Sequence, residues 1–237
     1  MQRVPHQART PITKDTADAE LAKRAACGDD AAFEAIMRRY NRRLFRTARS
    51  VLNSDVEAED ALQDAYLHAW RAMGSFRAEA QLSTWLVRIV VNEAAGRLRR
   101  KKAQLIPLDT AMTTFELSSQ ASLADEPDQA PDLVAMRAQL RVLLEARIDL
   151  LPEIFRTVFM LRAIEEMSVE EVSQALEIPE STVRTRYFRA RSLMREGLAR
   201  EIDVALSDAF AFDGARCDRV VAAVLVSGRT DGLSTHT

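Results

Sequence analysis

Residues 168–194 read SVEEVSQALEIPESTVRTRYFRARSLM, a pattern that predicts two helices joined by a tight turn. Ser168 followed by Glu171 is a capping-box pattern, in which each residue satisfies a free backbone N–H group at the start of a helix. Residues 177–179 interrupt the apolar periodicity, and a second helix is expected from about Glu180. The stretch is therefore a candidate helix-turn-helix.

The second helix of this stretch has two faces of opposite character. At 100° per residue, the inward face comprises Val183, Tyr187, Ala190 and Met194. The outward face comprises Ser181, Thr185, Phe188, Arg189, Ser192 and Arg195, flanked by Arg184 and Arg191. An outward face of this kind suits the DNA major groove, where arginine pairs with guanine edges and an aromatic ring or a methyl group touches thymine methyls.

A plainer interpretation of this helix stays open, that of a helical hairpin with a solvated face of arginines. Two features favour a binding surface instead. An outward Phe188 leaves apolar area exposed unless a partner covers it. The cations also gather on the second helix, whereas the first carries Glu170 and Glu171. Attraction to phosphates would explain the charge but not the aromatic side chain.

The segment 83–102, STWLVRIVVNEAAGRLRRKK, predicts a helix that begins as a packing surface and ends in dense positive charge. The apolar positions that fit helical spacing are Leu82, Trp85, Leu86, Ile89, Val90 and Ala94. A strand is the alternative, because residues 87–91 are rich in β-branched side chains. Five of the six residues from Arg97 to Lys102 are cations.

A further helix is expected from about Ser54 to Met73. Ser54 with Glu57 repeats the capping-box pattern, and Gly74 is expected to close the helix in the left-handed conformation. The stripe expected to be buried comprises Leu62, Ala65, Ala69 and Met73, and the residues left outward are Asp60, Gln63, Asp64 and Leu67.

The composition of the chain favours an all-helical protein of two domains in a reducing cytoplasm. The 237 residues are 47% apolar and include only seven glycines and seven prolines. Cys27 and Cys217 have no cysteine or histidine neighbours at ligand spacing, so neither a disulfide framework nor a zinc site is predicted. The longest apolar run, residues 220–226, is far shorter than the roughly 20 residues that a spanning helix needs, and no membrane insertion is expected.

The net charge of −2 hides an uneven distribution along the chain. Residues 1–103 carry 19 Lys and Arg against 13 Asp and Glu, whereas residues 104–136 carry six carboxylates and no cation. The expected order is a flexible tail (1–18), a first helical domain (19–103), a flexible acidic linker (104–131), a second helical domain with the helix-turn-helix (132–200) and a C-terminal extension (201–237).

Taken together, these motifs resemble a bacterial sigma factor of the extracytoplasmic-function class over about residues 20–200. The polymerase-binding helix of that family is similar to residues 57–76, EAEDALQDAYLHAWRAMGSF. Its promoter-melting segment is similar to residues 83–102, and its minus-35 module is similar to residues 151–194. The first two segments lie before the acidic linker and the third lies after it, and this combination in this order makes the resemblance specific.

The resemblance implies three sets of binding residues. The minus-35 set is Arg162, Ser181, Arg184, Thr185, Phe188, Arg189 and Arg191. The minus-10 set is Trp85, Arg88, Asn92, Arg97, Arg99 and Arg100, with Asn92 lining the pocket for an everted base. The core-polymerase set is Asp60, Gln63, Asp64 and Leu67. Core RNA polymerase and promoter DNA are the implied partners, and the family pattern allows for an anti-sigma factor.

Other interpretations of single residues stay open. Trp85 suits the protein core better than a stacking platform, Asn92 suits a capping or solvated amide, and the polar face around Gln63 suits plain solvation. The linker carboxylates suit either a mimic of phosphate charge in a nucleic-acid channel or a merely soluble connector.

No nucleophile with a base, no metal-ligand cluster and no glycine-rich phosphate loop is evident in the sequence, so no enzymatic activity, metal or cofactor is expected. The rival hypotheses are a free-standing helix-turn-helix regulator and a protein-binding adaptor. A short helix is also expected at 217–226. The role of the extension stays open between regulation and covering of the second domain by Val220, Val221, Val224 and Leu225, and covering is the preferred interpretation.

Overall fold

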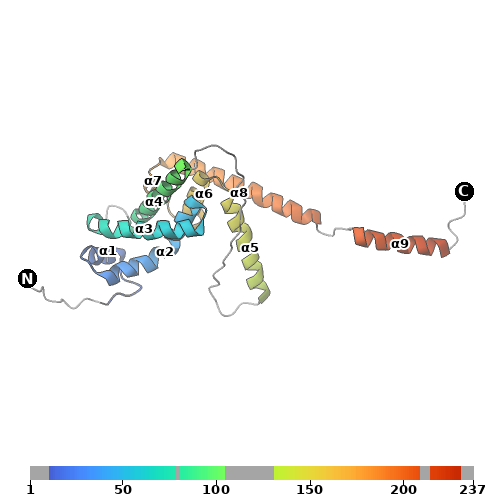
Figure 1. Cartoon of the computed structure of the whole chain (residues 1–237), viewed down its shortest axis with the longest axis horizontal. Helices are drawn as coiled ribbons and strands as arrows, with labels where there is room; N and C mark the ends of the chain where they lie inside the picture. Colours follow the sequence, from blue (N-terminus) through green and yellow to red (C-terminus); the bar gives the residue numbers. More distant parts are fainter. Residues whose placement is uncertain (1–10, 78–80, 105–130, 209–213, 231–237) are drawn as a thin grey trace, which may run out of the picture. The chain divides into compact units, whose positions relative to one another are not determined.

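A computed structural model describes residues 11–77, 81–104, 131–208 and 214–230 (Figure 1). Its helices are α1 (Asp18–Ala26), α2 (Asp30–Leu52), α3 (Asp55–Ala72), α4 (Leu82–Gln104), α5 (Pro131–Asp149), α6 (Glu153–Phe159), α7 (Val169–Leu176), α8 (Glu180–Asp208) and α9 (Gly214–Thr230). A 3-10 turn, Met73–Ser75, follows α3, and a π-helical turn, Met160–Ile164, follows α6. These ranges contain no strand, so the all-α prediction is confirmed and α4 is a helix as preferred.

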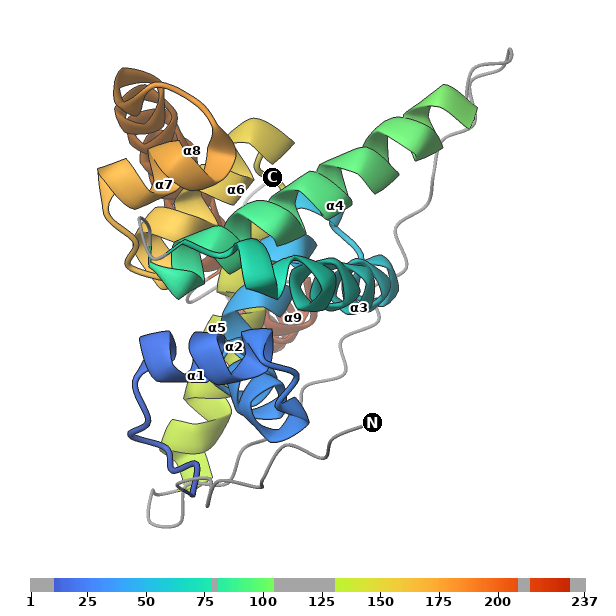
Figure 2. The ribbon, with the colours of Figure 1, turned by 90° about the vertical axis from the view of Figure 1, so that its left-hand side faces the viewer.

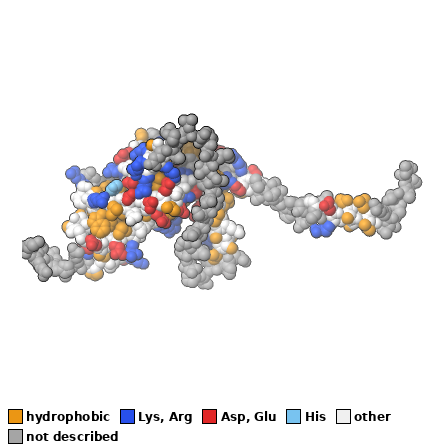
Figure 3. Space-filling view, viewed as in Figure 1, with side chains coloured by type: hydrophobic (Ala, Val, Ile, Leu, Met, Phe, Trp, Pro, Cys, Tyr) orange, Lys and Arg blue, Asp and Glu red, His pale blue; other side chains and the backbone are white. Residues whose placement is uncertain are grey.

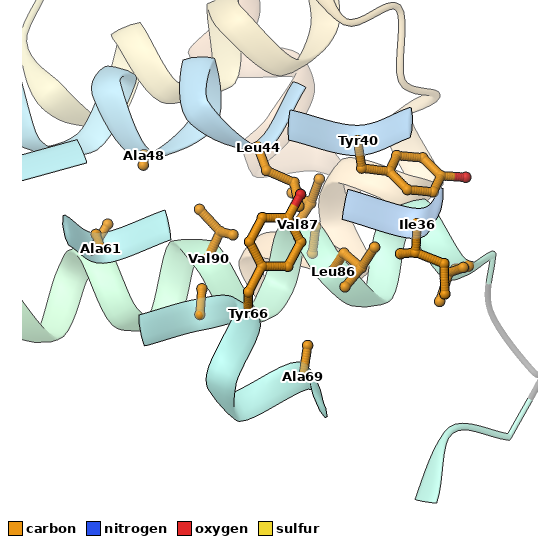
Figure 4. Packing of buried hydrophobic residues seen from close by; sticks show 14 of the residues in the cluster. Ile36, Tyr40, Leu44, Ala48, Ala61, Tyr66, Ala69, Leu86, Val87 and Val90 are labelled. Carbon is orange, nitrogen blue, oxygen red and sulfur yellow. The ribbon is translucent and has the colours of Figure 1, made fainter. Parts of the chain in front are cut away.

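The first module is a bundle in which α2 packs against α1, α3 and α4. Side chains from α2, α3 and α4 converge on one another in its centre, as Figure 4 shows for Leu44, Tyr66, Leu86 and Val90. The buried face of α3 consists largely of alanines: Ala58, Ala61, Ala65 and Ala69. Because interhelix distance depends on the side chains at the contact, this alanine face permits a close approach of α3 to its neighbours.

The caps of α3 match the sequence expectation at one end only. At its start, one half of the expected capping box is present: the Glu57 amide donates to Ser54 Oγ at 3.4 Å, while the Glu57 carboxylate pairs with Lys101. At its end the expectation for Gly74 is wrong, because Gly74 lies in the 3-10 turn and does not have a positive φ. A left-handed closing residue occurs at the end of α2 instead, where Asn53 has φ 56°.

The residues just before α1 are bound to α2 by hydrogen bonds. Arg39 donates through Nη2 to the carbonyls of Lys14 and Thr16, each at 2.8 Å, and through Nη1 to Asp18 at 2.5 Å. The Tyr40 hydroxyl also donates to the Asp18 carboxylate. Part of the tail expected over residues 1–18 thus contacts α2, and residues 1–10 lie outside the described part of the chain.

Two buried tyrosines in the core of the first module should make the protein less stable at alkaline pH. Burial raises the pKa of the Tyr40 and Tyr66 phenols, and the Asp18 carboxylate raises that of Tyr40 further. Above about pH 10 the unfolded chain loses phenolic protons that the folded chain keeps, so the free energy of unfolding should fall. The free energy of unfolding should fall by at most about 1.4 kcal/mol per tyrosine for each pH unit. Denaturant unfolding at a series of pH values measures this slope.

The matched control is the double variant Tyr40→Phe with Tyr66→Phe. Tyr66→Phe gives up one hydrogen bond, from the hydroxyl to the Met37 carbonyl at 3.2 Å, so it should cost about 1 kcal/mol at neutral pH. Above pH 10 the double variant should lose stability less steeply than the parent. Equal slopes would show that other groups cause the alkaline transition.

The second module contains α5, α6, α7 and the first half of α8, and it packs against the first. Val158, Leu161, Val172 and Val183 belong to the same buried cluster as the core of α2, α3 and α4. A smaller cluster joins Ile148, Leu151, Ala190 and Met194. Residues 1–194 consequently form one compact unit that holds two helical domains, whereas the sequence suggested two separate bodies on a linker.

The second unit, residues 195–237, includes the end of α8 and all of α9. α8 runs on to Asp208, beyond the expected boundary at residue 200, and α9 is longer than the predicted helix at 217–226. The side chains expected to cover the second domain are exposed: Val220, Val221, Val224 and Leu225. Whether they cover the second domain stays a prediction. The linker residues 105–130 lie outside the described residues, as does the prediction about their carboxylates.

Candidate nucleic-acid interface

The helix-turn-helix has the caps that the sequence predicted. The Glu171 amide donates to Ser168 Oγ at 3.0 Å, and the Ser168 amide donates to Glu171 Oε2 at 2.6 Å, which completes the capping box. Glu177 ends α7 in the left-handed conformation with φ 54°, and Ser173 Oγ donates to the Ile178 carbonyl at 2.6 Å. The turn is thus fixed by local hydrogen bonds, which sets the direction in which α8 leaves it.

The two faces of α8 are separated as predicted. Val183, Ala190 and Met194 are buried, and Tyr187 is half-buried. The exposed residues of the predicted minus-35 set are Ser181, Arg184, Thr185, Phe188, Arg189 and Arg191. Phe188 is 75% exposed, although burying a phenylalanine side chain usually contributes about 2 kcal/mol. The face therefore combines cations with an uncovered aromatic ring.

Arg162 differs from the rest of that set because it lies on the π-helical turn rather than on α8. Its guanidinium donates to the Met167 carbonyl and lies 5.5 Å from the centre of the Tyr187 ring, on which Arg191 also sits at 5.8 Å. Arg162 therefore braces the loop before α7 against Tyr187 on the inner face of α8.

The predicted minus-10 residues on α4 fall into two groups. Arg88 and Asn92 are exposed and lie one helical turn apart. Trp85 is half-buried, and its ring packs against Phe76 with a centroid distance of 5.3 Å and an interplanar angle of 52°. Arg88 and Asn92 form the accessible polar edge of α4, with Trp85 partly in the core behind it.

The basic end of α4 is largely paired with carboxylates. Arg97 donates to the Asp64 carboxylate, to the Asp60 carbonyl at 3.3 Å and to Glu93 at 3.3 Å. Further pairs are Arg100 with Glu93 at 3.4 Å, Lys101 with Glu57 at 2.5 Å and Lys102 with Glu153 at 3.3 Å. Figure 3 accordingly shows blue and red side chains intermixed on this face rather than one continuous basic surface. Arg99 and Arg100 are exposed, whereas Arg97 fastens α4 to α3.

Two protein-family models match this chain. The model of Sigma-70 region 2 matches residues 36–104, and the model of Sigma-70, region 4 matches residues 141–194. The ECF RNA polymerase sigma factor SigM of Mycobacterium tuberculosis is 36% identical over 179 residues, which cover 75% of this chain and 83% of that protein. The RNA polymerase sigma-H factor of Pseudomonas aeruginosa is 30% identical over 182 residues, covering 76% and 93%. The chain belongs to the ECF sigma factors.

Solved structures of sigma factors share its fold. CnrH in complex with the cytosolic domain of CnrY is 25% identical, with a TM-score of 0.53, and covers 77% of this chain and 97% of that one. The sigma factor RpoE of Bartonella quintana, in complex with the anti-sigma factor NepR, is 22% identical, with a TM-score of 0.52 and coverages of 70% and 96%. In this sigma factor, region 2 thus comprises residues 36–104 and region 4 comprises residues 141–194.

The outer face of α3 in region 2 contains a residue that the sequence analysis missed. Asp60, Gln63 and Leu67 are exposed as predicted, while Asp64 is half-buried against Arg97. Trp70, three residues after Leu67, is 41% exposed, and its ring lies against Phe33 with a centroid distance of 4.5 Å and an interplanar angle of 48°. Leu67 and Trp70 therefore form an apolar strip beside the polar residues. The i, i+3 spacing of two large apolar residues on a polar face was the available signal.

The described helices of this sigma factor include none that is both long enough and apolar enough to cross a bilayer. Among the same residues, no group of three or more His, Cys, Asp and Glu side chains has the geometry of a metal site.

Proposed function

We propose that this chain binds core RNA polymerase and directs it to promoters, reading the minus-35 element with α8 and opening the minus-10 element with α4. The observation that carries the proposal is the exposed face of α8, where Phe188 stands 75% exposed among arginines on a capped helix-turn-helix. A solvated surface would explain the arginines, but an uncovered aromatic ring favours a partner that covers it.

At the minus-35 element, α8 would enter the major groove with its outward face. Arg184 and Arg189 have the fork geometry that grips guanine O6 and N7, and Phe188 offers apolar contact to a thymine methyl. Ser181 and Thr185 lie on the same face and provide hydroxyls for base edges or phosphates. Arg162 and Arg191, stacked on Tyr187, would reach the backbone at the flank.

At the minus-10 element, the exposed edge of α4 would receive an unstacked base. The Asn92 amide supplies one donor group and one acceptor for the base edge, and Arg88 supplies a cation one turn away. Arg99 and Arg100 would contact the phosphates of the strand. We assign Arg97 a positioning role, because its guanidinium is already held by Asp64 and Glu93.

The core polymerase would bind the outer face of α3, through Asp60, Gln63, Leu67 and Trp70. Asp64 would contribute from the edge, where it also anchors Arg97. The chain itself would perform no chemistry, and it would act in the cytoplasm, where polymerase and DNA are found. Because CnrH and RpoE are seen with CnrY and the anti-sigma factor NepR, respectively, an anti-sigma partner is part of the proposal.

A transcription assay with purified core polymerase and linear genomic templates tests this function. Adding the chain should produce discrete transcripts that core enzyme alone does not make. Asn92→Ala should reduce strand opening, measured by permanganate reactivity of unpaired thymines, whereas the control Arg38→Ala changes an exposed α2 side chain outside all three binding sets. Transcripts that appear only when another sigma subunit is present would instead identify a helix-turn-helix regulator. An adaptor would give no transcripts in either case.

A further inference from the structure

The basic end of α4 contains one acidic side chain beside the residues proposed to hold the minus-10 strand. Figure 2 shows the last turns of this helix extending beyond the other helices of region 2. Glu93 directly follows Asn92, and it is the only carboxylate in the sequence of residues 92–104. Its side chain is 13% exposed. A carboxylate at this place opposes the attraction of α4 for phosphate, so its contacts decide what it does there.

Glu93 links two arginines along one face of α4. Its Oε1 atom accepts from Arg97 Nε at 3.3 Å and from Arg100 Nη2 at 3.4 Å. These partners follow it by four and seven residues, which places all three side chains on the same side of a helix. His68 Nδ1 of α3 lies 3.6 Å from Glu93 Oε2, too far for a hydrogen bond. Glu93 therefore acts on the two arginines of its own helix.

The two arginines are held unequally. Arg97 also donates to the Asp64 carboxylate and to the Asp60 carbonyl at 3.3 Å, and its side chain is largely buried. The Arg100 side chain is 66% exposed, and within the described residues its one ion pair is the 3.4 Å contact with Glu93. Charge-assisted hydrogen bonds are usually 2.7–2.9 Å long, so this contact is weak. Arg100 can therefore exchange its partner, whereas Arg97 is fixed.

A second guanidinium lies close to that of Arg100. Gly96 has no side chain, and a Cβ atom built there would lie 3.6 Å from Arg100 Nη1 and 3.9 Å from Arg99 Nη2. Both guanidiniums therefore lie over the same part of the helix surface. A phosphate that approaches this surface can bind arginine through two parallel hydrogen bonds. The single long contact with Glu93 is the weaker alternative for Arg100.

We propose that Glu93 is an internal counter-anion of Arg100 that sets how tightly region 2 holds the minus-10 strand. The inference rests on the function proposed above. Without DNA, Glu93 holds Arg100, and when the strand binds, a phosphate takes the place of Glu93, which stays paired with Arg97. Phosphate attraction is independent of sequence, so a built-in anion lowers non-specific binding and leaves selection to base contacts such as that of Asn92.

The variant Glu93→Gln removes the charge and keeps the shape of the side chain. The probe is a labelled promoter duplex, taken from a transcript of the assay above, in which the minus-10 region is mismatched and unpaired. Holoenzyme is titrated onto it at salt concentrations from about 50 to 200 mM. The variant should bind about 3- to 10-fold tighter at low salt, and its salt slope should steepen by about 0.7, the value of one further phosphate on a single strand.

The matched control is Glu34→Gln on α2. It changes the net charge by the same amount and releases an exposed arginine, Arg38, that belongs to none of the three binding sets. Its affinity and salt slope should equal those of the parent. An equal gain in the control would show that overall charge, and not the place of Glu93, causes the effect, and it would overturn the proposal.

A second pair of variants tests whether Glu93 acts through Arg100. Arg100→Gln alone should flatten the salt slope by about 0.7, because one phosphate contact is lost. Adding Glu93→Gln to Arg100→Gln should change the slope little, since the arginine that it would release is absent. A gain that persists without Arg100, a slope that Arg100→Gln leaves unchanged, or weaker binding by a Glu93→Gln variant of intact helix content would each overturn the proposal.

Transcription by the same holoenzymes separates this inference from the function on which it rests. A parent that starts no transcripts with core polymerase would refute the proposed function and this inference with it. A parent that initiates normally, while Glu93→Gln leaves affinity and salt slope unchanged, would refute the role of Glu93 alone.

Discussion

Arg156→Ala is expected to lower the free energy of unfolding by about 3–5 kcal/mol, the largest effect of any single polar substitution proposed for this chain. The Arg156 side chain is 6% exposed and donates to the carbonyls of Ser50, Val51, Asp149 and Leu151. Removing it leaves buried carbonyls without these donors and opens a cavity at the contact of regions 2 and 4. Denaturant unfolding of the full chain, followed by circular dichroism, measures the effect.

The charge on Arg156 survives its burial. Burial lowers the pKa of the guanidinium, but arginine is so strong a base that the group remains a cation at neutral pH. Arg156→Lys tests whether charge alone is sufficient. Lysine brings a point charge without the planar fork, cannot serve carbonyls on both sides and should recover only part of the loss. A loss below 1 kcal/mol for Arg156→Ala would mean that water satisfies the same carbonyls.

A matched control for this prediction is Arg38→Ala. Arg38 lies on α2 with a side chain that is 78% exposed and that pairs with Glu34 of the same helix at 2.8 Å. Exposed pairs of this type contribute less than about 1 kcal/mol. The contrast between the two arginines therefore separates burial from charge.

The helices of this chain follow from local sequence, and so do the faces of α8. Apolar residues at three- and four-residue spacing and the Ser168 capping box place α7 and α8 with little need for tertiary information. Phe188 was predicted to face outward and does. What local sequence supplies is periodicity and capping, because both depend on neighbours within one or two turns.

The contact between the regions was not predictable in the same way. Arg156 is an ordinary cation in the sequence EIFRTVF, and the carbonyls that bury it lie 105 and 106 residues earlier. Glu165 is likewise one carboxylate among several until Arg43 and Arg46 meet it across 122 and 119 residues. Periodicity contains no information about such partners, so two separate domains were the natural expectation.

The contact between the regions also explains why the sequence of α4 was compatible with both a helix and a strand. Its run of residues 87–91 looked strand-like, and Val87 was left off the predicted buried stripe although it is fully buried. α4 packs against α2 and α3 and also against α7, so more than one of its faces is apolar. A helix buried on several sides loses the one-sided pattern from which helices are recognised.

The other large expected effect concerns reading of the minus-35 element. Arg189→Ala should weaken binding of the holoenzyme to a promoter duplex about 10- to 100-fold, since a bidentate arginine–guanine contact is worth about 1–3 kcal/mol. Arg189 is exposed on α8, so the substitution should leave the free energy of unfolding within about 0.5 kcal/mol of the parent. Binding is measured by titration of labelled promoter DNA with holoenzyme, because an isolated region 4 lacks the gain from joint attachment.

The form of the loss distinguishes base reading from attraction to phosphate. If Arg189 reads a base, its loss should relax discrimination at one base pair of the minus-35 element and leave binding to other positions unchanged in rank. If it contacts phosphate, all sequences should weaken equally and the salt slope should fall by about one. Arg200→Ala is the control, an exposed arginine of α8 beyond region 4. Equal losses for Arg189→Ala and Arg200→Ala would remove Arg189 from the recognition face and leave α8 as a solvated helix.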